Sequence, residues 1–464
     1  MVLSCPSTEM EEIDMAMGNF DWEFLTELLE NRQFRKLRET MADMNEVDIA
    51  EFIEEQELEK KVLVYRMLPK ELAADVFSFL EVEDQEHIIN SITDYELGKI
   101  IEDLYVDDAV DMLEELPAIV VKRVLKNAAP DTRALINQFL QYPENSAGSI
   151  MTAEYIGLKR NMTVEQAFAY IRENGVDKET IYTCFVTDSK RQLQGVVTVK
   201  DLLMNPYHTI IKDIMDENII YAVTTEDQEE VVEAFNKYDL LCLPVVDHED
   251  RLVGIVTVDD VVEVMEQEAT EDFEKMAAML PSEKPYLKTS VLELAKNRIP
   301  WLLLLMFTSL LTGAILVTYE NALQVVPLLI SFIPMLMDTS GNCGNQSSTM
   351  VIRGMAVGDI ELRDVVKVAW KELRVGFLCG LVLAAANFAR LLLQYPDQIL
   401  VNLVVVLSLV LTVILAKTIG CTLPMLAKRM NLDPAIMAAP LITTIVDACS
   451  LMIYFRLACA LLKI

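Results

Sequence analysis

The feature that most constrains the fold of this chain is an apolar segment of 20 residues without a charge, over 299–318. A helix of this length crosses the hydrocarbon core of a bilayer. We therefore expect five membrane-spanning helices in the region 299–464, and not the buried core helices of a large soluble protein. Four further apolar segments lie close behind the first, over about 322–337, 375–389, 398–427 and 434–462.

The loops between these segments predict an orientation. Lys296 and Arg298 precede the first segment, five basic residues separate the second from the third, and Lys428 and Arg429 separate the fourth from the fifth. The other two connections carry no Lys or Arg. Because basic loops stay in the cytoplasm, we expect a multi-pass protein of the plasma (inner) membrane, with the N-terminus cytoplasmic and the C-terminus outside.

The region before the first span is strongly acidic. Residues 1–299 hold 28 Lys and Arg against 63 Asp and Glu. Such a region repels itself unless cations neutralise it, and it makes nucleic acid an unsuitable partner because phosphate binding needs a basic face. The eight cysteines are scattered without CxxC spacing, which predicts neither a disulfide framework nor a zinc site. No phosphate-loop, HExxH or GxSxG pattern is present, so no enzyme is predicted.

The acidic region has two parts. Residues 1–147 contain successive short amphipathic helical patterns with Asp, Glu or Pro at the joints, and these need to stack because each is too short to bury its apolar face alone. An internal repeat follows, in which Gly195-Val-Val-Thr-Val-Lys-Asp-Leu matches Gly254-Ile-Val-Thr-Val-Asp-Asp-Val, 59 residues later. Ile150-Met-Thr and Ile214-Met-Asp echo one another as well. We expect an α-helical superhelix over 1–147 and two α/β units over 148–210 and 211–272.

A charged segment, VVEVMEQEATEDFEKM, leads from the second unit toward the membrane. A run of charge is ordinarily a solvated helix face, but its position before the first span favours a role in gating. We expect a connecting (plug) helix over 273–298.

Taken together, these features resemble the MgtE family of magnesium channels over essentially the whole chain. Gly341-Asn-Cys-Gly-Asn-Gln346 is similar to the family's GNxGNQ signature, and Asp433-Pro-Ala435 followed by PLITTIVD (440–447) resembles its fifth-span pore segment. The resemblance implies a multidomain chain: an α-helical N-domain superhelix, tandem α/β cystathionine-β-synthase-type (CBS) domains, a connecting helix and a five-helix all-α transmembrane domain. It also implies a homodimer with a pore on the dimer axis that magnesium closes.

The candidate pore residues share an ability to hold a hydrated ion. Mg²⁺ releases its water reluctantly, so a pore for it needs negative charge and oxygen atoms that bind first-shell waters. Asp447 is the carboxylate of the fifth span, and an ionisable group inside a membrane is a functional candidate. Asn342, Asn345, Gln346, Thr443 and Thr444 offer neutral oxygens, Gly341 and Gly344 permit close approach and exposed carbonyls, and Pro440 frees a carbonyl.

Alternatives stay open for several of these residues. Asn342 and Gln346 also suit hydrogen bonds that join helices. Asp447 also suits a buried ion pair with Lys417 or Arg456. For Lys417 we expect an ion pair with Asp338, with snorkelling toward the cytoplasmic face as the alternative.

By resemblance, regulatory Mg²⁺ sites line the gaps between the cytoplasmic parts. Repelling acidic surfaces would separate without cations, and several bound Mg²⁺ ions would bridge them and close the pore. The carboxylates implied are Asp227, Asp239, Asp260, Glu263, Glu268, Glu271 and Asp272, with Asp107 or Asp108 on the N-domain.

The CBS units suit either nucleotide sensing or a plain dimerisation scaffold. Thr183 and Leu240 stand where an aromatic adenine platform is expected, so ATP is doubtful although Asp201 is present.

The resulting prediction is a divalent-cation channel that mediates Mg²⁺ uptake, with Mg²⁺ as permeant and regulatory ion and the lipid bilayer and a second copy as partners. The alternatives are an ion-coupled secondary transporter, which five spans do not favour, and a membrane-anchored Mg²⁺ sensor without transport.

Overall fold

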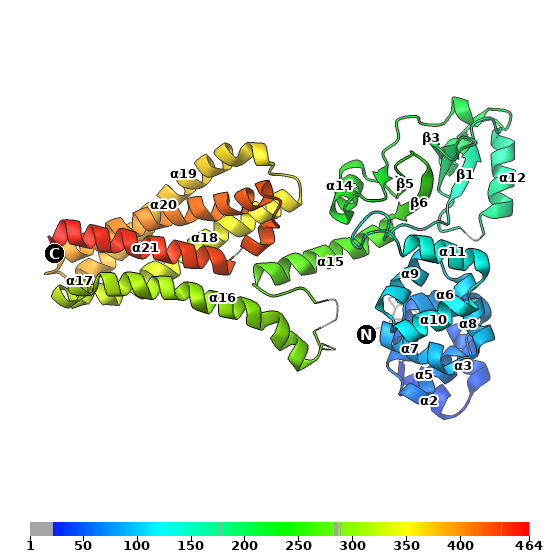
Figure 1. Cartoon of the computed structure of the whole chain (residues 1–464), viewed down its shortest axis with the longest axis horizontal. Coiled ribbons are helices and arrows are strands. Elements are labelled where there is room, and N and C mark those ends of the chain that lie inside the picture. Colours follow the sequence, from blue (N-terminus) through cyan, green and yellow to red (C-terminus); the bar gives the residue numbers. More distant parts are fainter. Residues whose placement is uncertain (1–21, 177, 283–285, 288, 438, 464) are drawn as a thin grey trace, which may run out of the picture. The chain divides into compact units, whose positions relative to one another are not determined.

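The computed structural model describes residues 22–463 apart from 177, 283–285, 288 and 438 (Figure 1). The chain forms two compact units, Met1–Val262 and Glu263–Ile464, which are described separately. The first 21 residues of the expected N-domain lie outside the described residues.

Short helices form the N-domain of the first unit, and they share one apolar core as expected from their patterns. Leu37, Ile53, Phe77 and Ile101 are fully buried in this core. Proline or a capping side chain delimits several helices, as Thr93 does with its capping box. The helices are α2 (Trp22–Glu30), α3 (Phe34–Met41), α4 (Glu46–Glu54), α5 (Leu58–Tyr65), α6 (Lys70–Ser78), α7 (Val82–Ser91), α8 (Asp94–Asp103), α9 (Val106–Glu115), α10 (Ala118–Asn127) and α11 (Pro130–Phe139).

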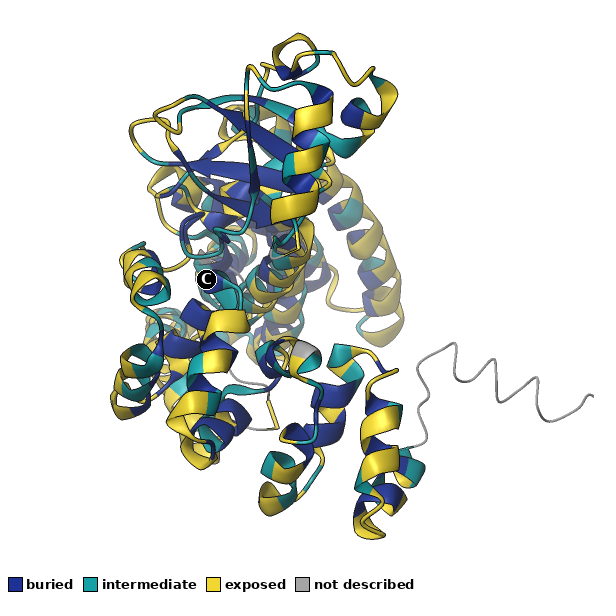
Figure 2. Ribbon diagram, turned by 90° about the vertical axis from the view of Figure 1, so that its right-hand side faces the viewer, coloured by how far each residue is buried: buried dark blue, intermediate teal, exposed yellow. Residues whose placement is uncertain are grey.

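Two small three-stranded sheets follow, and they confirm the internal repeat. In each, the first strand is parallel to the second and the second is antiparallel to the third. The register shifts at Val186/Thr187 in one sheet and at Val245/Val246 in the other, at matching places in the repeat. Figure 2 shows the strands as largely buried. The elements are β1 (Ile156–Lys159), α12 (Val164–Asn174), β2 (Thr183–Thr187), β3 (Leu193–Thr198), α13 (Val199–Met204), η1 (Ile211–Asp213), β4 (Ala222–Val223), α14 (Gln228–Tyr238), β5 (Cys242–Val246) and β6 (Leu252–Thr257).

The echo between Ile150-Met-Thr and Ile214-Met-Asp has a structural reason. Thr152 forms a bridge with Ile255 of the second sheet, and Asp216 forms one with Val196 of the first. Each preceding methionine packs on a strand glycine: a Cβ on Gly254 would lie 2.7 Å from Met151 Sδ, and a Cβ on Gly195 would lie 2.7 Å from Met215 Sδ. The segment before each repeat therefore completes the sheet of the other repeat, which joins the two CBS units.

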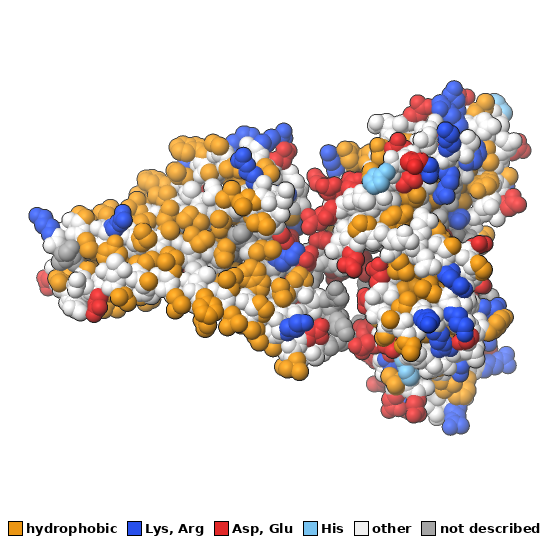
Figure 3. Space-filling view, in the orientation of Figure 1, with side chains coloured by type: hydrophobic (Ala, Val, Ile, Leu, Met, Phe, Trp, Pro, Cys, Tyr) orange, Lys and Arg blue, Asp and Glu red, His pale blue; other side chains and the backbone are white. Residues whose placement is uncertain are grey.

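Long helices dominate the second unit. Among the residues that the structure describes, four helices are long and apolar enough to cross a membrane: Val291–Thr318, Leu362–Gln394, Ile399–Arg429 and Pro440–Leu462. Figure 3 shows hydrophobic side chains covering the flanks of these helices. The elements are α15 (Val258–Met276), which begins in the first unit, then α16 (Val291–Thr318), α17 (Glu320–Val325), η2 (Pro327–Phe332), α18 (Ile333–Ala356), η3 (Leu362–Asp364), α19 (Val365–Gln394), α20 (Ile399–Arg429), η4 (Pro434–Met437) and α21 (Ala439–Leu462).

Two expected segments differ from the observed helices. The second span, expected over 322–337, is broken into α17 and η2, and the long helix that follows is α18, whose middle is polar. A connecting helix is present, but it is α15, because the CBS strand β6 runs directly into it. The expected range 273–298 holds the end of α15 and the start of α16.

The methionine–glycine contact predicts the cost of a single methyl group. In Gly254→Ala, the new Cβ would lie 2.7 Å from both Met151 Sδ and the Thr152 carbonyl oxygen, so the strand must shift. We expect a loss of about 1–3 kcal/mol of stability, measured as a lower unfolding temperature of the full chain in detergent. Gly157→Ala is the matched control, because its Cβ would make an ordinary 3.5 Å contact with Tyr155. Equal melting of the two variants would contradict this packing.

Candidate functional site

The GNCGNQ segment lies in the middle of α18 and packs against α21. A Cβ on Gly341 would lie 3.0 Å from Thr443 Cγ2, and a Cβ on Gly344 would lie 2.9 Å from Ile442 Cγ2. The glycines therefore allow the two helices to touch, which brings the segment beside residues 440–447. The interpretation that these glycines expose their carbonyls is wrong, because the segment is continuous α-helix, whose carbonyls are bonded along the helix.

Asp447 lies at this helix contact with polar neighbours. The Ser340 hydroxyl of α18 is 3.3 Å from Asp447 Oδ1 and 2.8 Å from the Met337 carbonyl oxygen. Asp338, one turn before the GNCGNQ segment, is close enough for its carboxylate to repel that of Asp447. The structure thus adds Asp338 and Ser340 to the candidate ion site. Sequence reasoning missed Asp338 here because it assigned that residue to Lys417.

One face of α18 stays uncovered within the protomer. Asp338, Asn342 and Gln346 recur every fourth residue, and all three are exposed. The opposite face, with Ser340, Gly341, Cys343, Gly344, Ser347 and Ser348, is buried. The exposed face is therefore a polar stripe on a helix whose neighbours are apolar.

The remaining candidate pore residues have local roles. The hydroxyls of Thr443 and Thr444 donate to the Pro440 carbonyl oxygen at 2.9 and 3.0 Å, so that carbonyl is not freed toward a pore as expected. Asn345 Oδ1 is buried and, among the described residues, has no hydrogen-bond partner. Such a group is costly to leave unpaired, which marks Asn345 as a position whose partner is supplied by water, an ion or a second copy.

Lys417 does not pair with Asp338 as expected. Its ammonium lies 3.9 Å from Glu372 Oε2 of α19 and donates to Ser347 Oγ of α18 at 3.3 Å. The expectation was wrong because the rotation of α20 turns Lys417 toward α19, away from the polar stripe. Glu372 gave no signal as its partner, since it stands in a segment with several charges before the third apolar run.

An acidic cluster forms where the N-domain meets the CBS units within the first unit. Burial is the main reason that the pKa of Asp107 lies well above its usual value. The neighbouring charges of Asp108, Asp260 and Glu179 raise it further. The pKa of Glu179 is raised to about 7, chiefly by burial. The neighbouring charges of Asp259, Asp260, Asp108 and Glu154 add to this rise. The structure therefore brings together the predicted Asp107, Asp108 and Asp260.

This cluster also includes Glu179, which sequence reasoning missed. Glu179 lies between α12 and β2, in a stretch without regular structure, and no motif distinguishes it from other surface acids. Asp260 additionally accepts from Thr257 Oγ1 at 2.6 Å, so it stabilises the start of α15 as well.

Asp227 and Asp239 are not brought together by the fold. Asp227 caps the start of α14 through the Glu229 amide, and Asp239 ends the same helix with φ 51°. Eleven helical residues separate them, which is roughly 16 Å, so they cannot ligate one ion within a protomer.

Besides Asp259 and Asp260 in the first unit, the acids of α15 lie along residues 263–276, the part of the helix that belongs to the second unit. Gln267 donates to Glu263 at 3.2 Å, near the start of that part. Near its end, Lys275 Nζ lies 2.7 Å from both Glu271 Oε1 and Asp433 Oδ2. Burial raises the pKa of Asp272, and the charge of Asp433 raises it further. Glu268 and Glu271 add smaller increases, while Lys275 opposes the rise.

The last turns of α15 thus contact the segment just before α21. Asp433 stands directly before η4, and η4 leads into the helix that carries Asp447. Asp433 and Lys275 were not predicted as site residues, although Asp433 was recognised as part of a motif.

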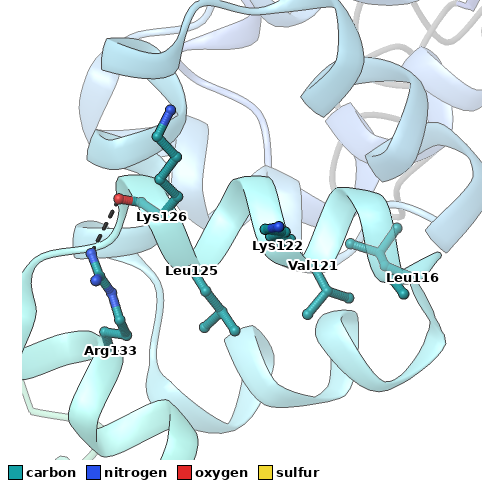
Figure 4. Close-up of a pocket in the computed structure, with 7 residues that line it drawn as sticks. Leu116, Val121, Lys122, Leu125, Lys126 and Arg133 are labelled. Atoms are coloured by element: carbon teal, nitrogen blue, oxygen red, sulfur yellow. Dashed lines mark hydrogen bonds between the residues drawn. The ribbon is translucent and has the colours of Figure 1, made fainter.

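Within the described part of the chain, no three His, Cys, Asp or Glu side chains converge tightly enough to hold a bare metal ion. A groove of about 590 Å³ on the N-domain has an apolar floor and a basic rim (Figure 4), and Arg133 there donates to the Lys126 carbonyl oxygen. It is unsuitable for a cation because no carboxylate is among its lining residues, which are Leu116, Ala118, Val121, Lys122, Leu125, Lys126 and Arg133.

The acidic cluster predicts a pH-dependent stability. A carboxyl group whose folded-state pKa is raised contributes full stability below its unfolded value and loses it as pH rises through the folded value. For Glu179 this window runs from about 4.5 to about 7. Without divalent cations, we expect the unfolding temperature of the full chain to fall between about pH 4.5 and pH 7.

Glu179→Gln should make this fall shallower, and Glu173→Gln on the exposed end of α12 is the matched control. The measurement is thermal unfolding in detergent with a chelator. A slope that Glu179→Gln leaves unchanged would contradict the burial of this charge among acids.

Comparisons with known proteins agree with this architecture. The profile for a family described as "Divalent cation transporter" (MgtE) matches residues 333–457, the one for the "MgtE intracellular N domain" matches 44–145, and the CBS domain profile matches 147–207 and 211–267. The magnesium transporter MgtE of Thermus thermophilus is 38% identical over 443 residues, 95% of this chain and 98% of the relative. The magnesium transporter MgtE of Bacillus subtilis is 31% identical over 93% of this chain and 95% of the relative.

Two solved structures resemble about half of this chain. The soluble part of a magnesium transporter aligns with a TM-score of 0.51 at 30% identity, over 53% of this chain and 98% of the other. The cytosolic domain of the Mg²⁺ channel MgtE in complex with ATP aligns with a TM-score of 0.50 at 38% identity, over 52% of this chain and 98% of the other. These relatives are transporters, and the expectation that the chain is not an enzyme is confirmed. The chain belongs to the MgtE family of magnesium transporters.

Proposed function

We propose that this chain forms a homodimeric channel for Mg²⁺ uptake across the plasma membrane, closed by cytoplasmic Mg²⁺. The observation that carries the proposal is the exposed polar stripe of α18, beside Asp447, within an otherwise apolar set of helices. The basic loops support a cytoplasmic N-terminus and an outside C-terminus. The magnesium transporters to which the chain is 38% and 31% identical support the choice of ion.

The polar stripe supports both the pore and the dimer. In lipid, Asp338, Asn342 and Gln346 would face hydrocarbon, which is costly for amide and carboxylate groups. A second copy related by a twofold axis places two such stripes opposite one another and encloses water between them. Asp447 and Asp338 then contribute four carboxylates from the two protomers.

This arrangement suits a hydrated ion. Because Mg²⁺ keeps several waters, carboxylates and amide oxygens hold it through those waters and need not converge on the metal itself. Asp447 supplies the charge, and Asn342, Asn345, Gln346, Thr443 and Thr444 supply oxygens around it. Gly341 and Gly344 keep α18 against α21, and Pro440 sits in the first turn of α21.

The gate that we propose uses the acids of the cytoplasmic region. Asp107, Asp108 and Asp260 lie in one cluster with Glu179, and Glu268, Glu271 and Asp272 lie in another with Asp433. Bound Mg²⁺ offsets the repulsion within each cluster and favours the state in which the acids are close. Asp227, Asp239 and Glu263 would act at further surfaces. ATP is not assigned a role.

The pore assignment is tested by Asp447→Asn in proteoliposomes. We expect Mg²⁺ uptake to fall at least about tenfold, because the variant removes the charge that attracts a divalent ion. Asp397→Asn is the matched control, since Asp397 lies exposed in the loop between α19 and α20. Normal uptake by Asp447→Asn would show that the pathway lies elsewhere.

The same assay separates the alternative functions. Uptake that needs a proton or sodium gradient would indicate a secondary transporter instead of a channel. A folded wild-type chain that moves no divalent ion under any condition would indicate a sensor.

The gate is tested by the double variant Glu271→Gln/Asp272→Asn. These two acids stand beside Asp433, so their loss removes much of the charge that a cation would neutralise. We expect the cytoplasmic Mg²⁺ concentration that halves the flux to rise at least about threefold. Glu266→Gln, on the exposed part of α15, is the control, and an equal shift in both would argue against a local site.

A further inference from the structure

A triad of one lysine, one glutamate and one serine joins three helices of the membrane domain, and the proposed conduction path does not use it. Lys417 of α20 is only 5% exposed. Its Nζ lies 3.9 Å from Glu372 Oε2 of α19 and 3.3 Å from Ser347 Oγ of α18. Ser347 Oγ also donates to Glu372 Oε2 at 2.5 Å, so one hydroxyl links the two charges.

Glycines enclose this triad. Gly376 lies one turn beyond Glu372, and a Cβ there would lie 3.1 Å from Ile414 Cα and 3.6 Å from Lys417 Cβ. A Cβ on Gly420 would lie 2.3 Å from the Gly344 carbonyl oxygen. Small residues at these places let the helix backbones approach closely, so Lys417 is buried while the Glu372 side chain stays 18% exposed.

The triad lies on the face of α18 opposite the polar stripe, one helix width from the candidate ion site. Ser347 follows Gln346, the last residue of the GNCGNQ segment, on the same helix. Lys417 therefore places a positive charge one side chain away from the helix that presents the polar stripe. In a region of low dielectric such a charge acts strongly on a passing cation, unless a nearby negative charge cancels it.

We propose that Glu372 neutralises Lys417, and that this neutralisation prevents Lys417 from weakening the attraction of divalent cations to the pathway. The inference rests on the proposed function of the membrane domain as a Mg²⁺ pathway. The Ser347 hydroxyl contacts both the carboxylate and the ammonium but adds no charge to the pair. The pair is neutral in total, so the acids of the polar stripe and Asp447 dominate the field.

The two charges predict opposite effects when each is removed alone. Glu372→Gln leaves an uncompensated ammonium, which repels Mg²⁺ and raises the concentration needed for half-maximal uptake. Lys417→Gln leaves an uncompensated carboxylate, which attracts Mg²⁺ and lowers that concentration. The double variant Lys417→Gln/Glu372→Gln is neutral again and should return close to wild type. Removal of a merely structural contact would shift both single variants in the same direction.

The experiment measures initial Mg²⁺ uptake into proteoliposomes against external Mg²⁺, with the full chain. We expect the half-saturating concentration to rise about tenfold in Glu372→Gln, to fall in Lys417→Gln, and to lie within about threefold of wild type in the double variant. Inhibition by the trivalent hexaamminecobalt(III) ion adds a test of electrostatics. Because the interaction energy scales with ion charge, a tenfold shift for Mg²⁺ predicts a shift of about 30-fold for the trivalent ion.

Ser347→Ala is the matched control, since it removes the hydroxyl and no charge, and its half-saturating concentration should stay near that of wild type. Shifts in one direction for both single variants, or an unchanged value in Lys417→Gln, would overturn the inference. If Glu372→Gln does not fold, Lys417→Gln and the double variant still decide the question. A wild-type chain that takes up no Mg²⁺ overturns the proposed function, and this result is visible before any variant is compared.

Discussion

A charge inside an apolar helix needs a partner or water, and this requirement organises the membrane domain. Lys417 meets it within the protomer, through Glu372 and Ser347 on two neighbouring helices. Asp447 meets it only in part, because Ser340 offers one long hydrogen bond and Asp338 repels it. The first arrangement is closed and neutral, while the second remains open and negative. An open negative site beside an exposed polar stripe is what a pathway for a hydrated cation requires.

Small residues decide which polar groups meet. Gly341 and Gly344 let α18 touch α21, and Gly376 and Gly420 let α19 and α18 approach α20. Lipid tails supply no hydrophobic force between helices, so close packing and interhelical hydrogen bonds have to hold them together. The GNCGNQ segment therefore has two faces with different tasks: its glycines pack inward, and the amides of Asn342 and Gln346 lie on the uncovered face. One motif thus fixes the helix contacts and presents the polar groups.

Much of the architecture could be predicted from the sequence alone. Membrane spans are visible as long apolar segments, the two CBS units as an internal repeat, and the short helices as amphipathic patterns. The partner of Lys417 could not be predicted from the sequence. Asp338 and Glu372 are both acids on neighbouring helices, and only the rotation of α20 about its axis determines which of them Lys417 meets. The sequence also does not show that the segments of Met151 and Met215 each pair with the sheet of the other repeat. Their similarity is visible in the sequence, but the strand that each segment joins is set only by the fold. Glu179 was missed because only the fold brings a loop acid next to Asp107.

The end of α15 shows how the acidic cytoplasmic region and the ion site can be coupled in the proposed mechanism. Glu268, Glu271, Asp272 and Asp433 carry four negative charges, and Lys275 supplies one positive charge among them. Lys275 therefore holds α15 to Asp433, but its single charge does not cancel the repulsion among the four carboxylates. The contact forms while these carboxylates still repel one another. In the proposed mechanism, a divalent cation offsets two of the three negative charges that remain. Asp433 precedes the helix of Asp447 by a single short turn of 3₁₀-helix, so a change in this balance acts on the start of the helix that lines the proposed pore.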